Sequence, residues 1–245
     1  MKIYGLIGNP LSHSFSQKYF TEKFRKQNIT GCSYLNFEIK DLSKEISRLR
    51  TDPFLSGLNV TIPYKSQIIP FLDAVSEVCK EIKACNCIKI NDGKWTGFNT
   101  DVIGFEKSFS PLLQPQHTKA LVLGTGGSSK AVAFVLKKLK IEFLFVSREK
   151  SNSATVINYE AITPLLLKEF TIVINTTPAG MFPNVDVYPQ LPYHSISEKH
   201  YFFDLIYNPS ETVFLSKAAA MGAQTKNGEA MLSIQAEESW NIWST

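Results

Sequence analysis

The sequence predicts an α/β fold, and two observations carry that prediction. Short apolar runs alternate with segments of helical periodicity along the whole chain, which is the pattern of βαβ units around a mostly parallel sheet. The composition is that of an ordinary globular protein, with 44% hydrophobic and 20% charged residues among 245. At roughly 150 residues per domain, this length predicts one or two domains.

The first part of the chain is predicted to alternate strands with helices. Apolar runs at 2–7, 33–38 and 57–61 predict strands, and the segments 14–28 and 41–49 predict helices, the second capped by Asp41 or Ser43. A further helix is expected over residues 73–80. Alternating residues on both sides of Asp92-Gly93 predict a hairpin, because this dipeptide favours the backbone of a tight hairpin turn.

A second pattern begins after Pro111 and Pro115. The run 119–123 predicts a strand that ends at Gly124, and segment 128–140 has apolar residues on one helical face. Further strands are expected at 142–146, 171–175 and 201–205, and helices at 211–221, ended by Gly222, and at 229–243. These elements predict half of a doubly wound sheet. The domain boundary is expected near residues 100–104, and the last helix could belong to either domain.

Charge and cysteine content exclude several classes of protein. The net charge of +4 is too small to require nucleic acid or an anionic membrane as a partner. The four cysteines form no C-x-x-C pair and no zinc-like cluster with histidine, so neither a metal site nor a disulfide framework is expected. The apolar N-terminal run stops at Gly8-Asn9-Pro10, too early for a signal peptide or a membrane span. A cytoplasmic protein with reduced thiols fits best.

A glycine-rich turn follows the strand at 119–123 and opens the next helix. It contains Gly124, Gly126 and Gly127, with Ser129 at the third glycine position of the dinucleotide fingerprint. Glycines let a pyrophosphate approach the backbone, and the helix start favours its negative charge. The alternative is a tight turn without a ligand. A Walker loop fits less well, because Lys130 is followed by Ala131.

The end of the next strand predicts the choice of cofactor. Ser147 is followed there by Arg148, Glu149 and Lys150. An arginine at this place accommodates a 2′-phosphate, and Lys150 adds a second positive charge, so NADP is favoured. Glu149 could repel a phosphate, and a solvated charged loop is the other interpretation.

Polar residues follow two further predicted strands. Asn59, Thr61 and Lys65 lie at the end of one, and Asp101 lies after another. Because strand ends line the ligand crevice of an open α/β sheet, these side chains could meet on one polyhydroxylated substrate. A lysine beside a carboxylate can stabilise and protonate the oxyanion of a reduced ketone. Taken alone, a surface lysine and aspartate are more often solvated than catalytic.

The segment after the first strand also offers a site. Ser14 and Ser16 stand at the start of a predicted helix, where they could cap it or, with the helix terminus, hold a carboxylate ligand. His13 has no partner that spacing identifies and is expected to be structural.

Seven ordered motifs resemble one family, shikimate dehydrogenase, an NADP-dependent enzyme of aromatic amino-acid and chorismate biosynthesis. They are distributed over the whole chain. They are Asn9-Pro10 with Ser14 and Ser16, the run 59–65, Asn99-Thr100-Asp101, the turn 124–127, Asn175 to Met181, Asp204 to Thr212, and Asn227 to Leu232 with Gln235.

The resemblance implies a substrate and catalytic domain of residues 1–102 plus 228–245, a Rossmann-like NADP domain of residues 103–227, and a cleft between them. Lys65 and Asp101 would be the catalytic pair in the reversible reduction of 3-dehydroshikimate. The implied substrate-binding residues are Ser14, Ser16, Asn59, Thr61, Asn86, Tyr207 and Gln235. The implied cofactor-binding residues are Gly124, Gly126, Gly127, Ser128, Ser147, Arg148, Lys150, Thr176 and Gly228. A small-molecule substrate and a monomer or homodimer are expected, without metal, membrane or nucleic acid.

Two other functions fit the same residues. A quinate or dual quinate/shikimate dehydrogenase, possibly NAD-using, shares the catalytic pair, and no second arginine follows Arg148 here. A non-catalytic metabolite sensor would have the same fold, but it is expected to lack the pair, and both Lys65 and Asp101 are present.

Overall fold

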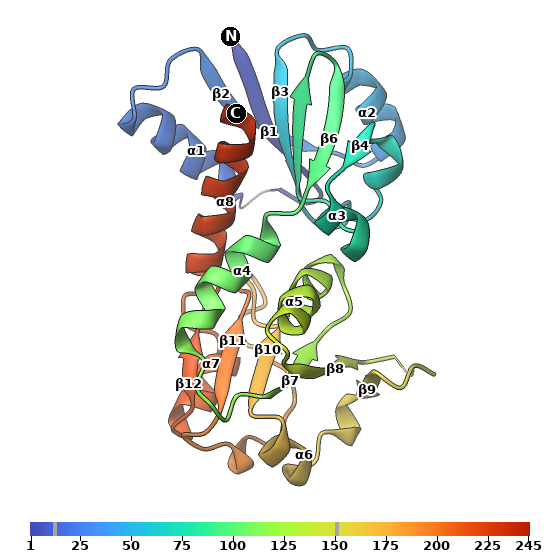
Figure 1. Ribbon diagram of the computed structural model, residues 1–245. Coiled ribbons are helices and arrows are strands. Elements are labelled where there is room, and N and C mark those ends of the chain that lie inside the picture. The colour runs from blue at the N-terminus through green and yellow to red at the C-terminus, as the bar shows by residue number, and fades with distance from the viewer. Residues whose placement is uncertain (12–13, 150–151) are drawn as a thin grey trace. The chain divides into compact units, whose positions relative to one another are not determined.

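The chain folds into two compact units, each built around its own sheet (Figure 1). The computed structural model describes residues 1–11, 14–149 and 152–245. The first unit contains residues 1–100 and 236–245, and the second contains residues 101–235. These limits differ from the expected 102/103 and 227/228 boundaries, mainly because the first half of the last helix packs within the second unit. The α/β class is confirmed.

The first unit has a mixed six-stranded sheet of order β2-β1-β3-β5-β6-β4. Strand β1 is parallel to β2 and β3, whereas β5 is antiparallel to β3 and β6. The hairpin between β5 and β6 is confirmed, with positive φ at Asp92 and Gly93. The strands are β1 (Lys2–Gly8), β2 (Cys32–Glu38), β3 (Leu55–Val60), β4 (Ala74–Val75), β5 (Cys87–Asn91) and β6 (Lys94–Phe98).

Helices cover both faces of this sheet, because the strands alternate their apolar side chains between two cores. Ile7 of β1 joins a core with α2 (Leu42–Leu49) and α3 (Glu77–Ile82). Its neighbour Leu6 joins the other core, with α1 (Phe15–Lys26) and the end of α8 (Glu229–Ser244). The short 3₁₀ helix η1 (Ile69–Phe71) precedes β4.

Aromatic contacts fix the C-terminal helix on the first unit. The Trp243 ring stacks on Tyr4 at 4.9 Å between centroids, and its indole N–H donates to the Ile88 carbonyl at 2.9 Å. An ion pair of 2.6 Å joins Lys23 of α1 to Glu237 of α8. Residues 236–245 therefore complete a core whose strands lie more than a hundred residues earlier.

The prediction of a helix over residues 73–80 is wrong for the first half of that segment. The Asp73 carboxylate accepts a hydrogen bond from the Trp95 backbone N–H at 2.7 Å and holds this segment extended as β4 beside β6. Helix α3 begins only after Ser76, whose hydroxyl accepts from the Cys79 N–H. A long-range contact thus overrides the local helical pattern.

The second unit has a parallel six-stranded sheet of order β12-β11-β10-β7-β8-β9. The chain leaves β7 in one direction through β8 and β9 and in the other through β10 to β12, so the sheet is doubly wound with its switch point between β7 and β10. The strands are β7 (Lys119–Leu123), β8 (Glu142–Ser147), β9 (Val156–Asn158), β10 (Ile172–Asn175), β11 (Tyr201–Asp204) and β12 (Gln224–Lys226).

Two pairs of helices cover the second sheet. Helix α4 (Asp101–Phe109) stacks Phe109 on Tyr201 and packs beside α5 (Gly127–Lys138). On the other face, α6 (Pro164–Glu169) and α7 (Val213–Ala220) bury Leu167 and Phe214. The 3₁₀ helices are η2 (Ser110–Leu112), η3 (Tyr159–Ala161) and η4 (Tyr193–Ser195).

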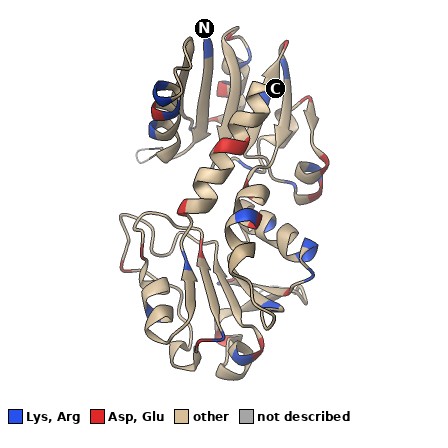
Figure 2. Cartoon of the chain, turned by 60° about the vertical axis from the view of Figure 1, so that its left-hand side comes forward, with Lys and Arg blue, Asp and Glu red and all other residues tan. Residues whose placement is uncertain are grey.

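Basic and acidic residues are interspersed in each unit (Figure 2). No helix in the described part of the chain is both long and apolar enough to cross a lipid bilayer.

Candidate functional site

In the first unit, hydrogen bonds between distant segments hold the backbone at or next to three of the expected site residues. Thr61 follows β3 and donates its backbone N–H to Ile7 of β1 at 2.9 Å. The half-buried Lys65 accepts the Cys85 N–H on its backbone carbonyl at 2.7 Å. Asn86, next in the chain, is buried, so the lysine-bearing turn is anchored beside it.

The Asn86 side chain in turn holds Thr100. Its Oδ1 accepts the Thr100 backbone N–H at 2.7 Å, and its Nδ2 donates to the Thr100 hydroxyl at 3.0 Å. Thr100 is the residue directly before Asp101. The position at which the chain enters the second unit is therefore fixed by a buried amide of the expected substrate site.

The Asn59 side chain forms hydrogen bonds with two side chains and one backbone carbonyl. Its Oδ1 accepts from the Tyr34 hydroxyl at 2.8 Å, and its Nδ2 donates to the Asn86 carbonyl at 3.2 Å and to the Ser239 hydroxyl at 2.9 Å. Both amide hydrogens are used, so Asn59 can offer a substrate hydroxyl only an acceptor. Tyr34 and Ser239 did not emerge from the sequence, because neither stands in a strand-end motif.

At the start of α1, the two serines differ in their partners. Ser14 occupies the capping position, but its hydroxyl makes no capping bond, so the capping interpretation is wrong for it. That hydroxyl is buried and has no hydrogen-bond partner among the described residues, which omit 12 and 13. The Ser16 hydroxyl bonds to Tyr34, the phenol whose pKa is raised well above its ordinary value by burial. His13 lies outside the described residues.

In the second unit, Asp101 and Gln235 lie at one crossing of helices. Asp101 is the first residue of α4, and Gly104 follows one turn later on the same face. A β-carbon at Gly104 would lie 2.7 Å from the Met231 carbonyl and 3.1 Å from Cβ of Gln235, so α4 and α8 are in close contact there. Asp101 and Gln235 are both buried.

Tyr207 follows β11 and is half-buried. The loop that carries it is held by Asp204, whose carboxylate accepts from Asn175 Nδ2 at 3.0 Å, from the Ile206 N–H at 3.0 Å and from the Thr212 hydroxyl at 2.7 Å. Burial raises the pKa of Asp204 to about 7, and these hydrogen bonds oppose the rise. Asp204 did not emerge as a site residue, because its burial is set by β10 and α7.

The glycine turn between β7 and α5 has the form of a pyrophosphate cradle. Gly124 has φ of +104°, which favours glycine, and its N–H donates to Val146 at 2.8 Å. At Gly126, the capping residue of α5, a β-carbon would meet no atom within 4 Å. This open helix start lies at the switch point of the sheet, where dinucleotides bind, so the residues present fit NADP.

The other expected cofactor residues lie around the same sheet edge. Ser128 is the second residue of α5, and Thr176 follows β10 and donates its hydroxyl to the Leu123 carbonyl at 2.6 Å. The N–H of Gly228 donates to Ile206 at 2.9 Å, just beyond β11. Ser147 ends β8 and accepts the Glu149 N–H at 3.1 Å. Arg148 is exposed, and Lys150 lies outside the described residues.

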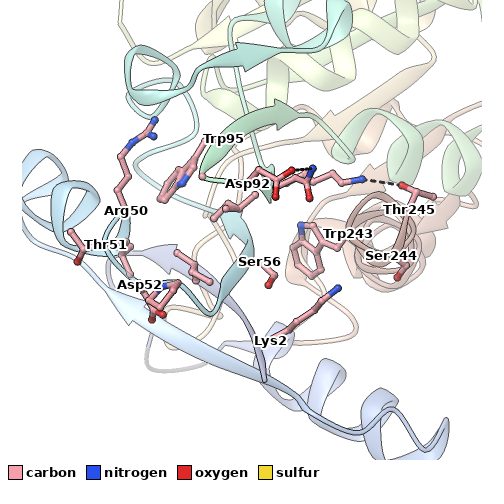
Figure 3. Close-up of a pocket in the computed structure, with 17 residues that line it drawn as sticks. Lys2, Arg50, Thr51, Asp52, Ser56, Asp92, Trp95, Trp243, Ser244 and Thr245 are labelled. Atoms are coloured by element: carbon pink, nitrogen blue, oxygen red, sulfur yellow. Dashed lines mark hydrogen bonds between the residues drawn. The ribbon is translucent and has the colours of Figure 1, made fainter.

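A cavity of about 580 Å³ in the first unit contains none of the expected site residues (Figure 3). It is lined by residues at the starts of β1 and β3, including Lys2 and Leu55, and by Trp95 and Trp243. Of the expected substrate residues, Ser14 and Ser16 follow the opposite end of β1, and Asn59 and Thr61 lie at the opposite end of β3. Among the described residues, no group of three or more His, Cys, Asp or Glu side chains could hold a metal ion.

Comparison with known proteins identifies the family. The sequence model of the "Shikimate dehydrogenase substrate binding domain" matches residues 6–88. A "Shikimate dehydrogenase (NADP(+))" from Methanococcus maripaludis strain C6 is 38% identical over 262 residues, covering 99% of this chain and 91% of the relative.

Solved structures of dehydrogenases are also similar to this chain over nearly its whole length. The crystal structure of shikimate dehydrogenase 1 from Peptoclostridium difficile gives a TM-score of 0.86 at 38% identity, covering 100% of this chain and 92% of the other. A quinate dehydrogenase from Corynebacterium glutamicum in complex with NAD gives 0.87 at 26% identity, covering 99% and 93%. On this near-complete similarity, the chain belongs to the shikimate dehydrogenase family.

Proposed function

We infer that this protein is an NADP-dependent shikimate dehydrogenase, which reduces 3-dehydroshikimate to shikimate reversibly. The observation that carries this inference is near-complete similarity to relatives named shikimate dehydrogenase (NADP(+)). The buried Asn59–Asn86–Thr100 network agrees with a site at these strand ends, because it connects them to the residue before Asp101.

We propose Lys65 and Asp101 as the catalytic pair. Two hydrogen bonds support this assignment: Lys65 is bonded through its carbonyl to Cys85, and the next residue, Asn86, holds Thr100. Only one peptide bond then separates Thr100 from Asp101. These bonds support the proposal because they hold the backbone on the first-unit side of both residues, at Lys65 and at Thr100.

When bound, NADPH supplies the hydride that reaches the substrate carbonyl carbon. The Lys65 ammonium then stabilises the negative charge that develops on the carbonyl oxygen and donates a proton to it. In the oxidation of shikimate, Lys65 accepts the hydroxyl proton. The Asp101 carboxylate would orient the lysine.

We propose that one set of substrate residues binds the ring carboxylate and another set binds the ring hydroxyls. The buried Ser14 hydroxyl, with Ser16 and the start of α1, would bind the ring carboxylate. Asn59 would accept a hydrogen bond from a ring hydroxyl, since both its N–H groups are used. The remaining proposed contacts to ring hydroxyls come from Thr61, Asn86, Tyr207 and Gln235.

On the cofactor side, the turn at Gly124, Gly126 and Gly127 with Ser128 would hold the pyrophosphate. The exposed Arg148 would bind the 2′-phosphate of NADP, together with Ser147 and Lys150. Thr176 follows β10, and Gly228 follows β12 and bonds to Ile206 beyond β11; both would contact the nicotinamide half. We also propose that the protein works in the cytoplasm as a monomer or homodimer.

The test is oxidation of shikimate and, separately, quinate by the purified protein, each with NADP⁺ and with NAD⁺, followed by the absorbance of the reduced nicotinamide. Activity with shikimate and NADP⁺ is expected. Preference for quinate or NAD⁺ would instead support the alternative that the quinate dehydrogenase similarity raises. Shikimate binding without turnover in all four assays would favour a sensor.

A further inference from the structure

The Ser239 side chain lies in a buried hydrogen-bond network of the first unit. It comes from the C-terminal half of α8 and is fully buried. Its hydroxyl accepts the Asn59 amide at 2.9 Å and lies 3.3 Å from the Thr100 hydroxyl. Ser239 thereby bridges the ends of two strands that are not adjacent in the sheet, at Asn59 near the end of β3 and at Thr100 after β6.

A third contact comes from β5. The Cys87 thiol bonds to the Ser239 hydroxyl, and burial raises the pKa of this thiol to about 12, so it stays protonated. Cys87 directly follows Asn86, which is bonded to the same Thr100. The Ser239 hydroxyl therefore contacts the Asn59 side chain directly. Through Thr100 it is also connected to Asn86, which bonds to Thr100, and to Asp101, which follows Thr100 in the chain. All three are residues proposed to serve the reaction.

We propose that Ser239 is a positioning residue of the active site, which fixes the Asn59 amide and the Thr100 backbone through this network. The inference rests on the proposed function, since it assigns Ser239 a role in the same substrate site. Ser239 is buried behind Asn59 and acts through it, without contact to the reacting atoms.

The physical reason lies in how Asn59 is oriented. The Asn86 carbonyl can only accept, so it determines which end of the Asn59 amide is Nδ2; Tyr34 then donates to Oδ1, and Ser239 accepts the second N–H. Removing the Ser239 acceptor leaves a buried N–H without its partner, and the amide loses one of the hydrogen bonds that prevent its rotation. Its one remaining acceptor site then no longer faces the substrate hydroxyl in a fixed direction.

The experiment compares wild type, Ser239→Ala, Asn59→Ala and the double variant in shikimate oxidation with NADP⁺. Ser239→Ala is expected to lower kcat/KM for shikimate about tenfold, the effect of one buried hydrogen-bond partner, while KM for NADP⁺ stays within about twofold. The double variant is expected to lose no more than Asn59→Ala does alone, because both changes act on one amide.

Three controls separate positioning from general destabilisation. Thr171→Val removes another buried hydroxyl, bonded to Gln116 in the second unit, and Ser244→Ala makes the same change at an exposed site of α8. Both are expected to leave kcat/KM within about twofold of wild type. Ser239→Thr keeps the hydroxyl and is expected to retain most activity.

The outcomes are distinct. Fully additive losses in the double variant, an unchanged kcat/KM in Ser239→Ala, or a loss in Ser239→Thr equal to that in Ser239→Ala would each overturn the positioning role. If wild type oxidises no shikimate, the proposed function itself fails, and the role of Ser239 fails with it.

Discussion

Two effects of opposite sign determine how Gly104→Ala changes the free energy of unfolding. In an exposed helix interior, replacing glycine by alanine stabilises a protein by about 1 kcal/mol. At Gly104, however, the new methyl group would lie 2.7 Å from the Met231 carbonyl oxygen, which belongs to the backbone of α8 and cannot rotate away. Such overpacking costs about 1–3 kcal/mol. The net expectation is a destabilisation of about 1 kcal/mol.

At about 2–4 °C per kcal/mol for a chain of this size, Tm should fall by about 3 °C in thermal denaturation. Because the methyl group also lies 3.1 Å from Cβ of Gln235, separation of the helices should raise KM for shikimate several-fold. Ser216→Ala on the exposed face of α7 is the control and should keep or slightly raise Tm. A rise in Tm for Gly104→Ala equal to that of the control would refute the close crossing of α4 and α8.

Three further predictions follow from the site. Lys65→Ala should lower kcat at least about hundredfold with shikimate still bound, whereas Lys89→Ala in the same unit should not; near wild-type turnover would remove Lys65 from catalysis. Arg148→Ala should raise KM for NADPH far more than for NADH, and equal losses would exclude a 2′-phosphate contact. Because the pKa of Asp204 in the folded protein is about 7, against an ordinary value of 3.8, the folded state binds the proton more tightly, and wild-type stability should fall as pH rises from about 4 to 7. Asp204→Asn should flatten that slope in Tm measured across this range, and an unchanged slope would contradict the assignment.

The sequence predicted those parts of the fold that are encoded within a few residues. Alternation around Asp92-Gly93 suffices for the hairpin, because the turn requires a left-handed backbone that few dipeptides adopt. The apolar run before Gly124 and the periodic segment after it likewise predicted β7 and α5. Motif order along the chain was specific enough to indicate the family before any geometry was known.

Other features depended on contacts between distant segments. The backbone at residues 73–75 is extended because Asp73 bonds to Trp95, which no local pattern contains. Similarly, Ser239 stands 180 residues from Asn59, and in its own sequence it is an ordinary polar residue of a helix.

The sequence by itself therefore determined the α/β class, the strand-ending motifs and the glycine turn, since backbone preference and hydrophobic period are local properties. Only the tertiary structure decided which buried hydroxyls and amides share hydrogen bonds, such as Ser239 with Asn59 and Thr100. The physical reason is that a buried polar group must find a partner wherever the packing of the sheet and helices places one, and that partner is set by the fold rather than by neighbours in the chain.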